Sequence, residues 1–405
     1  MLVESWYPED TRVRNEAVLL ASAGYQVSVI SLKKPGQKWR ETLDGVRVYR
    51  VPRLEWFKKT ADGEPTHVGL VLLKLKSFLG YCLEYIYFTS VSLLVSLVLF
   101  VTKGFDVIHA HNPPDTLFLV ALPFKLLGRK FIFDHHDLSP ELYLSRYRAK
   151  PGMLTRLLRL AEWCSLRLAD ITIATNESYK RVQIERGGRD PNSIVIVRNG
   201  PNPARMRPPA PNSKLRAMNK CILCYVGSLN PQDGVDYLLR SLHHVLHTLK
   251  RDDFHCVIMG TGDSIEDLRK MAAELQLNGA VDLTGFVSEE ELEANLAAAD
   301  ICVDPDPSSP LNDVSTWIKI MEYMAYSKPI VTFDLKETRF SAQEGALFVP
   351  ANDEHAFARA IVELMDNPLL RKKIGAAGRK RVEEKLQWSV VSENLLAAYR
   401  KLLKT

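Results

Sequence analysis

The sequence predicts an α/β fold made of two domains, each built on a parallel β-sheet. The chain has 405 residues, a length that suits two domains of about 150–200 residues better than one ordinary core. Short apolar runs alternate with helical segments in both halves, which is typical of parallel sheets covered by helices. Residues 198–211 contain prolines and a glycine that disfavour regular structure, so the domain boundary is expected there.

The predicted strands follow in chain order. A short N-terminal strand precedes strands at residues 26–32, 46–51, 106–109, 130–134, 171–174 and 194–197. A second sheet starts at Cys221 and continues at residues 254–259, 281–284, 301–303, 330–333 and 347–349. An amphipathic helix is expected at residues 389–403. The expected domains are residues 1–200 and 221–385, with a linker at 201–220 and a C-terminal helix at 386–405.

Composition excludes some classes of protein. The net charge of +5 is too small for a dedicated nucleic-acid binder, and an anionic substrate or membrane surface accounts for it. The six cysteines lie in apolar runs, as reduced thiols of cytoplasmic proteins do. Cys221 and Cys224 resemble a redox or zinc pair, but three residues apart in a strand they face opposite ways. We therefore expect no disulfide and no metal there, and no signal peptide at the N-terminus.

Residues 312–325 carry one lysine and one glutamate in an otherwise apolar helical pattern. Lys319 and Glu322 lie three residues apart, so both project from one face. A carboxylate in such surroundings needs a hydrogen-bonding partner, and the two hydroxyls of a ribose would serve. The alternative is an ordinary Lys–Glu surface pair. Four polar residues suit a helix N-cap and its first turn, where free N–H groups bind anions such as phosphate: Asn312, Asp313, Ser315 and Thr316.

Further motifs, taken together with this helix, resemble the sequence pattern of a known family. They occur in a fixed order at residues 8–14, 106–112, 136–141, 225–229, 257–262 and 283–287. Any one of them is weak, but their order across both halves is specific. Together with the helix they resemble the retaining nucleotide-sugar glycosyltransferases of family 4, of the kind that assembles bacterial polysaccharides and lipid-linked glycans. The resemblance implies the GT-B fold, in which two Rossmann-like domains face each other across a cleft and the C-terminal helix crosses back to the first domain.

The same resemblance implies an activity. The enzyme would move a hexosyl or N-acetylhexosaminyl group from a nucleoside diphosphate, UDP more often than GDP, to an acceptor such as a lipid-linked saccharide. It would need no metal and no cofactor. Two alternatives remain: a nucleotide-sugar epimerase of the same fold, and a non-catalytic subunit or membrane adaptor. No nucleic-acid partner is expected, and the oligomeric state is not predicted.

Site residues follow by matching motifs, since the reaction must hold a diphosphate beside an oxocarbenium-like sugar. The catalytic candidates are His136 and Asp137. The acceptor-side candidates are Asp10, Arg12, His111 and Asn112. The donor-binding candidates are Gly227, Ser228, Gly260, Gly262, Phe286, Val287, Asp313, Ser315, Thr316, Lys319, Glu322 and Arg198, with the backbone at residues 286–287 meeting the base.

The chain departs from the family pattern at the phosphates. Ser228 and Asp233 stand where the family usually has an arginine and a lysine, and Val314 stands where it has a first glutamate. We expect Lys319 and Arg198 to replace the missing cations. The motif at residues 304–306, Asp-Pro-Asp, imitates a metal-binding pair. Because Lys319 and helix amides already supply positive charge, no metal is expected there.

Residues 85–101 carry no charge and reach the lower length limit of a membrane span. Strands of one predicted sheet lie on both sides of this stretch, so a single span would split the domain. Two alternatives remain: a core helix, or a helix lying in a membrane interface. Basic residues upstream favour binding to anionic lipid at the inner face of the cytoplasmic membrane: Lys58, Lys59, Lys74 and Lys76.

Overall fold

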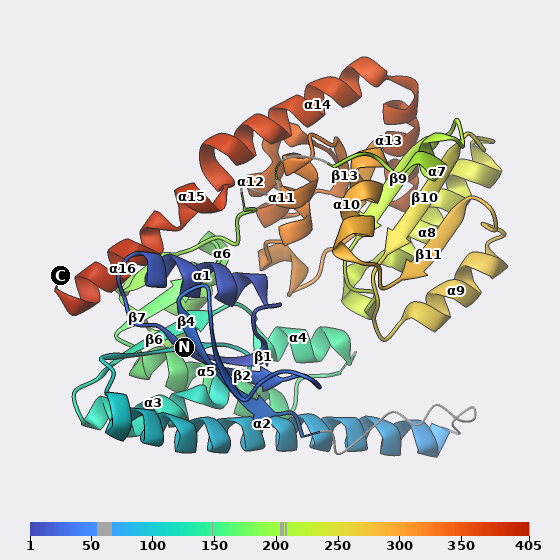
Figure 1. The fold of residues 1–405 in the computed structure, drawn as a ribbon. Coiled ribbons are helices and arrows are strands. Elements are labelled where there is room, and N and C mark those ends of the chain that lie inside the picture. Colours follow the sequence, from blue (N-terminus) through green and yellow to red (C-terminus); the bar gives the residue numbers. More distant parts are fainter. Residues whose placement is uncertain (55–66, 148, 203–205, 207–208, 405) are drawn as a thin grey trace. The chain divides into compact units, whose positions relative to one another are not determined.

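The computed structural model describes residues 1–54, 67–147, 149–202, 206 and 209–404. These form two compact units (Figure 1). Unit 1 comprises Met1–Pro140, Pro151–Val197 and Ser392–Thr405, and unit 2 comprises Glu141–Lys150 and Arg198–Val391. Lys58 and Lys59, and residues 203–205 and 207–208 of the expected linker, lie outside the described residues.

Unit 1 is built on an eight-stranded sheet in the order β3-β4-β2-β1-β5-β6-β7-β8. Neighbours are parallel except β3 and β4, which are antiparallel. The strands are β1 (Leu2–Trp6), β2 (Ser28–Lys33), β3 (Arg40–Leu43), β4 (Val46–Pro52), β5 (Val107–His111), β6 (Lys130–His135), β7 (Ile171–Ala174) and β8 (Ile194–Ile196). The helices are α1 (Thr11–Ser22), α2 (His67–Lys103), α3 (Phe118–Leu126), α5 (Met153–Leu168), α6 (Glu177–Gly187) and α16 (Glu393–Leu403), with the start of α4 (Ser139–Arg146).

Unit 2 is built on a six-stranded parallel sheet in the order β11-β10-β9-β12-β13-β14. The strands are β9 (Cys221–Val226), β10 (Phe254–Met259), β11 (Val281–Gly285), β12 (Ile301–Asp304), β13 (Ile330–Phe333) and β14 (Ala346–Val349). The helices are α7 (Ser213–Arg216), α8 (Val235–His243), α9 (Ile265–Glu274), α10 (Glu289–Ala298), α11 (Ile318–Ala325), α12 (Lys336–Ala342), α13 (Glu354–Asp366), α14 (Pro368–Arg381) and α15 (Trp388–Val391).

The predicted fold class is confirmed: both units are Rossmann-like, with helices around parallel sheets. The predicted strands agree with the structure to within two residues at each end. The sequence analysis missed β3, an antiparallel edge strand in which charged and polar residues replace the apolar run of a buried strand. The predicted last helix is wrong in one respect, because Ser392 divides it into α15 and α16.

Strand order reverses once in each sheet, and this locates the sites. In unit 1, β1 pairs with β2 on one side and β5 on the other. In unit 2, β9 pairs with β10 on one side and β12 on the other. Loops leaving the carboxyl ends of such neighbouring strands diverge, and open α/β sheets bind their ligands in the crevice so formed. Each unit therefore has one crevice where candidate residues should gather.

The helix predicted to begin near Asn312 begins six residues later, and the predicted N-cap is wrong. Residues 312–314 form a separate 3-10 turn, and α11 starts at Ile318 after Trp317 in extended conformation. The N–H groups of Val314 and Ser315 donate to Leu311 O and to Asn312 O, inside that turn. The amides expected to bind phosphate are thus engaged, and the free N–H groups of the first helical turn belong to α11 itself.

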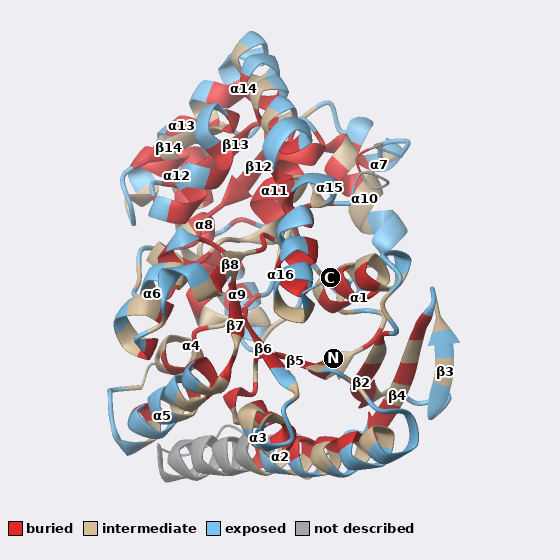
Figure 2. Ribbon diagram, turned by 90° about the vertical axis from the view of Figure 1, so that its left-hand side faces the viewer, coloured by how far each residue is buried: buried red, intermediate tan, exposed pale blue. Residues whose placement is uncertain are grey.

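Helix α2 presents one face to the core of unit 1 and another outward (Figure 2). Phe88, Thr89, Ser92 and Ser96 are buried. Ile86, Leu94, Leu97, Val98 and Val101 are exposed, and Leu83–Lys103 is long and apolar enough to cross a membrane by length and composition alone. The strands on either side of α2 in the chain, β4 and β5, belong to one sheet, as predicted. The helix is therefore only partly a core helix.

Close packing of backbone makes Gly260 indispensable to unit 2. Its φ is +144°, and a Cβ there would lie 1.7 Å from the carbonyl oxygen of Gly227. We predict that Gly260→Ala lowers the free energy of unfolding by about 2–4 kcal/mol, since backbone strain adds to the clash. The measurement is urea unfolding of the full chain.

Gly279→Ala is the matched control for this prediction. Gly279 also has a positive φ, +82°, but a Cβ there would meet nothing within 4 Å. Only the conformational cost of about 1–2 kcal/mol should appear. Equal destabilisation by the two substitutions would show that contact with Gly227 does not constrain the loop.

Candidate functional site

Asn112 organises the carboxyl edge of unit 1. Its Oδ1 accepts hydrogen bonds from the backbone N–H groups of His136 at 2.7 Å and Asp137 at 3.1 Å. Its Nδ2 donates to Asp115 Oδ1 at 3.0 Å and to the carbonyl oxygen of Asp137 at 2.7 Å. Both ends of the amide are thus used inside the protein. Asn112, predicted on the acceptor side, holds the segment that carries both predicted catalytic residues.

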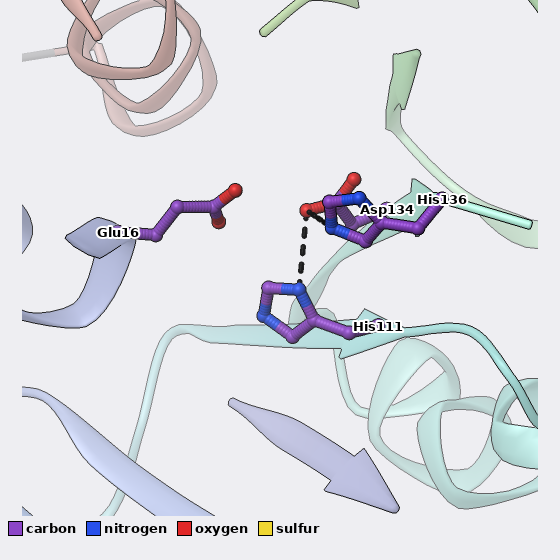
Figure 3. A group of neighbouring side chains, drawn as sticks. All are labelled: Glu16, His111, Asp134 and His136. Atoms are coloured by element: carbon purple, nitrogen blue, oxygen red, sulfur yellow. Dashed lines mark ion pairs between the residues drawn. The ribbon is translucent and has the colours of Figure 1, made fainter. Parts of the chain in front are cut away.

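Beneath this edge, Asp134 at the end of β6 is surrounded by histidines (Figure 3). Its Oδ2 lies 2.9 Å from His136 Nε2, 3.1 Å from His111 Nδ1 and 3.5 Å from His109 Nε2. Burial alone would raise the pKa of Asp134, but the charge of His136 and contacts with the histidines hold that pKa well below its usual value. Burial lowers the pKa of His111 to about 3. At neutral pH the cluster contains an ionised Asp134 and an uncharged His111.

Glu16, on α1, completes this cluster and was not predicted. Burial and the neighbouring charge of Asp134 raise the pKa of Glu16 well above its usual value. His109 Nε2 lies 3.7 Å from Glu16 Oε2, and its Nδ1 lies 3.0 Å from the hydroxyl of Tyr399 on α16. The sequence carried a weak signal for Asp134, which directly precedes His135 and His136. It carried none for Glu16, which lies between Asn15 and Ala17 in an ordinary helical pattern.

Asp10 and Arg12, also predicted on the acceptor side, pair with each other. Asp10 Oδ1 caps α1 by accepting from the N–H groups of Arg12 and Val13, and Arg12 Nη2 lies 3.0 Å from Asp10 Oδ2. Burial favours the neutral acid, yet Arg12 holds the pKa of Asp10 at about 2. Asp137 and Asp134 also act on the charge of Arg12. The structure therefore brings all six candidates of unit 1 to one edge.

In unit 2, Lys319 lies between the two carboxylates of the Asp-Pro-Asp motif. Its Nζ is 2.9 Å from Asp304 Oδ1 and 2.6 Å from Asp306 Oδ2, and the side chain is buried. It also lies over the ring of Tyr225, 4.8 Å from the centroid. Burial would lower the pKa of Lys319, but Asp304 and Asp306 raise it well above its usual value. The ammonium thus occupies the position between carboxylates where a metal ion was considered.

The other predicted cation, Arg198, also faces a carboxylate. Its Nη2 lies 3.7 Å from Glu337 Oε2, and its guanidinium lies 4.3 Å from the centroid of the Phe340 ring. Asp233, which replaces a usual lysine, is buried, and burial raises its pKa. Lys319 and Arg198, the residues predicted to replace the missing cations, both lie against carboxylates. Their role toward phosphate remains a prediction.

The remaining donor candidates lie around the carboxyl edge of unit 2. A Cβ at Gly260 or Gly262 would come within 3 Å of backbone, and one at Gly227 would come within 3 Å of the Tyr225 hydroxyl. Ser228 and Phe286 are exposed, while Val287 and Glu322 are half-buried. Asp313, Ser315 and Thr316 precede α11 instead of lying in it. The Ser315 hydroxyl donates to the carbonyl oxygen of Leu311.

Comparison with protein families matches both halves of the chain. A model described as "Glycosyl transferase 4-like domain" matches residues 10–200, and one described as "Glycosyl transferases group 1" matches residues 220–367. A phosphatidyl-myo-inositol mannosyltransferase from Mycobacterium leprae is 30% identical over 229 residues, which cover 56% of this chain and 58% of that protein. The chain spans about half the length of the curated relatives it matches.

Solved structures share the fold at low identity. Sucrose-phosphate synthase from Thermosynechococcus elongatus has a TM-score of 0.76 at 19% identity, covering 99% of this chain and 95% of that one. HepE from Anabaena in complex with UDP-glucose has a TM-score of 0.69 at 17% identity, covering 100% and 98%. These likenesses establish the two-domain architecture known as GT-B.

The buried ion pair of Lys319 predicts a stability effect. Lys319→Met would leave the charge of Asp304 buried without its partner, and should lower the free energy of unfolding by about 3–5 kcal/mol in urea. Adding Asp304→Asn should recover part of this loss, because the unpaired charge is then removed.

Lys336→Met, at an exposed position on α12, is the control and should change stability by no more than about 0.5 kcal/mol. If Lys319→Met changes the free energy of unfolding no more than this control does, the predicted role of the ion pair is refuted.

Proposed function

Because the chain belongs to the glycosyltransferase families that these two models describe and has the GT-B fold, we propose that it is a retaining glycosyltransferase. It transfers a sugar from a nucleoside diphosphate sugar to an acceptor. The observation that carries this proposal is that both halves match in the order such enzymes require. The models describe glycosyltransferases, so the epimerase alternative is not favoured.

Unit 2 is the proposed donor side. Its crevice between β9 and β12 collects the loop at residues 227–229, the Asp-Pro-Asp motif and α11. Glu322 accepts hydrogen bonds from the ribose, and the backbone of Phe286 and Val287 meets the base. UDP is the preferred nucleotide, with support from the UDP-glucose complex of the structural neighbour HepE. The first turn of α11 supplies N–H groups to the diphosphate.

The proposed donor site needs no metal at the diphosphate. Divalent cations in such enzymes neutralise phosphate charge through carboxylates, and here Lys319 already holds Asp304 and Asp306. Unit 1 is the proposed acceptor side. His136 and Asp137 act nearest the transferred sugar, with Asp10, Arg12 and His111 beside them. A hexose or N-acetylhexosamine is the proposed cargo.

Donor binding tests this assignment through Glu322→Gln. The substitution keeps shape but removes a charge, and a hydrogen bond to a charged group contributes about 1.5–3 kcal/mol. We predict a loss of donor affinity or turnover of roughly tenfold or more, at about 1.4 kcal/mol per decade. The measurements are calorimetric titration with UDP-glucose, UDP-N-acetylglucosamine and GDP-mannose, and nucleotide release with acceptor saccharides.

Glu363→Gln, on the exposed side of α13, is the matched control and should bind donor as the unaltered chain does. Equal affinity of the Glu322 and Glu363 variants would remove Glu322 from the site. Failure of the unaltered chain to bind any nucleotide sugar would contradict the proposed function itself.

We also propose that unit 1 binds a membrane surface peripherally. The exposed apolar face of α2 continues over α3, which contacts both α2 and α5. On α5, Leu157, Leu160 and Trp163 are exposed, and so are the adjacent residues Arg156 and Arg159. Apolar and basic side chains mixed on one helix face are typical of helices that lie on anionic lipid. This favours a lipid-linked acceptor and a location on the inner face of the cytoplasmic membrane.

Vesicle binding tests the surface directly. The full chain should co-sediment with vesicles containing phosphatidylglycerol at low salt, and release at high salt. Arg156→Gln with Arg159→Gln should weaken binding roughly 30-fold, because each basic residue contributes about 1 kcal/mol. Leu157→Ser with Leu160→Ser should also release the protein.

Leu369→Ser, at an even more exposed leucine on α14 of unit 2, should leave vesicle binding unchanged. If the folded chain ignores anionic vesicles at low salt, the acceptor is better sought among soluble saccharides.

A further inference from the structure

Four buried side chains in unit 1 have the composition of a metal site. Glu16, His111, Asp134 and His136 approach one another from α1 and from the ends of β5 and β6 (Figure 3). Their candidate ligand atoms all lie within 4.8 Å of one another. The most exposed of the four, His136, is only 6% accessible. Two imidazoles and two carboxylates are thus enclosed in one small volume.

The contacts within this cluster do not have the direction of hydrogen bonds. His136 Nε2 and His111 Nδ1 lie 2.9 Å and 3.1 Å from Asp134 Oδ2. Even so, both carboxylate oxygens of Asp134, both ring nitrogens of His111 and His136, and Glu16 Oε2 have no hydrogen-bond partner among the described residues. A buried polar group left unsatisfied costs about 1–3 kcal/mol. One cation would satisfy one such atom from each of the four side chains.

The charge of the cluster also suits a divalent ion. The two carboxylates supply the charge that balances a divalent ion once Glu16 gives up the proton that burial favours, because metal ligands bind in the deprotonated form. The nearby guanidinium of Arg12 is already paired with Asp10. His109 stacks on His111 with ring centroids 4.3 Å apart, and its Nδ1 contacts the Tyr399 hydroxyl. This stacking fixes the plane of the His111 ring.

We propose that Glu16, His111, Asp134 and His136 bind one divalent transition-metal ion. Mixed imidazole and carboxylate ligands suit Zn²⁺ or Mn²⁺, whereas Mg²⁺ and Ca²⁺ prefer oxygen ligands alone. The ion ties α1 to the ends of β5 and β6. The proposed site departs from the sequence-based expectation of no metal. It is distinct from any metal site at the donor diphosphate. It does not depend on the proposed function, because bound metal is measured without any sugar transfer.

Metal content of the full, untagged chain tests the proposal. The variants are made in a His244→Gln, His355→Gln background, because the exposed rings of His244 and His355 lie 3.2 Å apart and would themselves hold Zn²⁺. The protein is stripped with a chelator, loaded with Zn²⁺ or with Mn²⁺, and desalted. We expect one ion per chain by mass spectrometry of the metal, a higher melting temperature with the ion, and no retention of Mg²⁺.

Two ligand variants and one control complete the experiment. Asp134→Asn and Glu16→Gln should each lower metal affinity by at least the roughly 10- to 100-fold that loss of an outer contact costs. His135→Gln is the control, because His135 is equally buried on β6 but faces Glu162 at 3.2 Å, and it should keep the ion. Glu16→Gln serves if the Asp134 variant does not fold, since Glu16 lies on a helix.

Two results would overturn the proposal. One is a folded background protein that retains neither Zn²⁺ nor Mn²⁺ and whose melting temperature does not respond to them. The other is equal metal content in the ligand variants and the His135 control.

Discussion

Buried carboxylates at the carboxyl ends of central strands constrain both units. Asp134 ends β6 and Asp304 ends β12, and both are fully buried. A buried charge is tolerated only when it is paired. In unit 2 the partner is Lys319, which requires α11 to turn that side chain toward β12. In unit 1 the partners are histidines from β5 and from the loop after β6. The positions of the candidate residues follow largely from these two requirements.

Most of the fold could be predicted because its signals are local. Apolar runs such as residues 254–259 and 330–333 mark buried parallel strands directly, and the structure places β10 and β13 there. β3 has no such run, since it pairs only with β4 at the edge of the sheet. The start of α11 was misplaced because Asn312 suits turns as well as N-caps. Its side chain instead donates to the carbonyl oxygens of Gln232 and Pro307, contacts that no local pattern shows.

The candidate site could be predicted only where motifs carried it. Asp10, Asn112 and His136 lie in loops after strands, and the structure gathers them at one edge of unit 1. Glu16 and Asp134 escaped notice because they lie far apart in the chain and only the tertiary fold brings them together. The sequence identified Lys319 as a site residue but did not identify the carboxylates with which it pairs. Asp304 and Asp306 resembled a metal-binding pair, and only the tertiary fold shows that a lysine lies between them.

The same pairing bears on how unit 2 would hold the proposed diphosphate without the usual cation pair. Burial would raise the pKa of Asp304, but Lys319 holds it below its usual value, so these two charges cancel. Burial and the charge of Asp304 raise the pKa of Asp306 well above its usual value. The three groups together are therefore neutral while Asp306 keeps its proton. A neutral group of three residues does not repel phosphate, and N–H dipoles at the start of α11 attract an anion. Loss of that proton would leave a net negative charge on these three groups, at the edge of the sheet where the donor is proposed to bind.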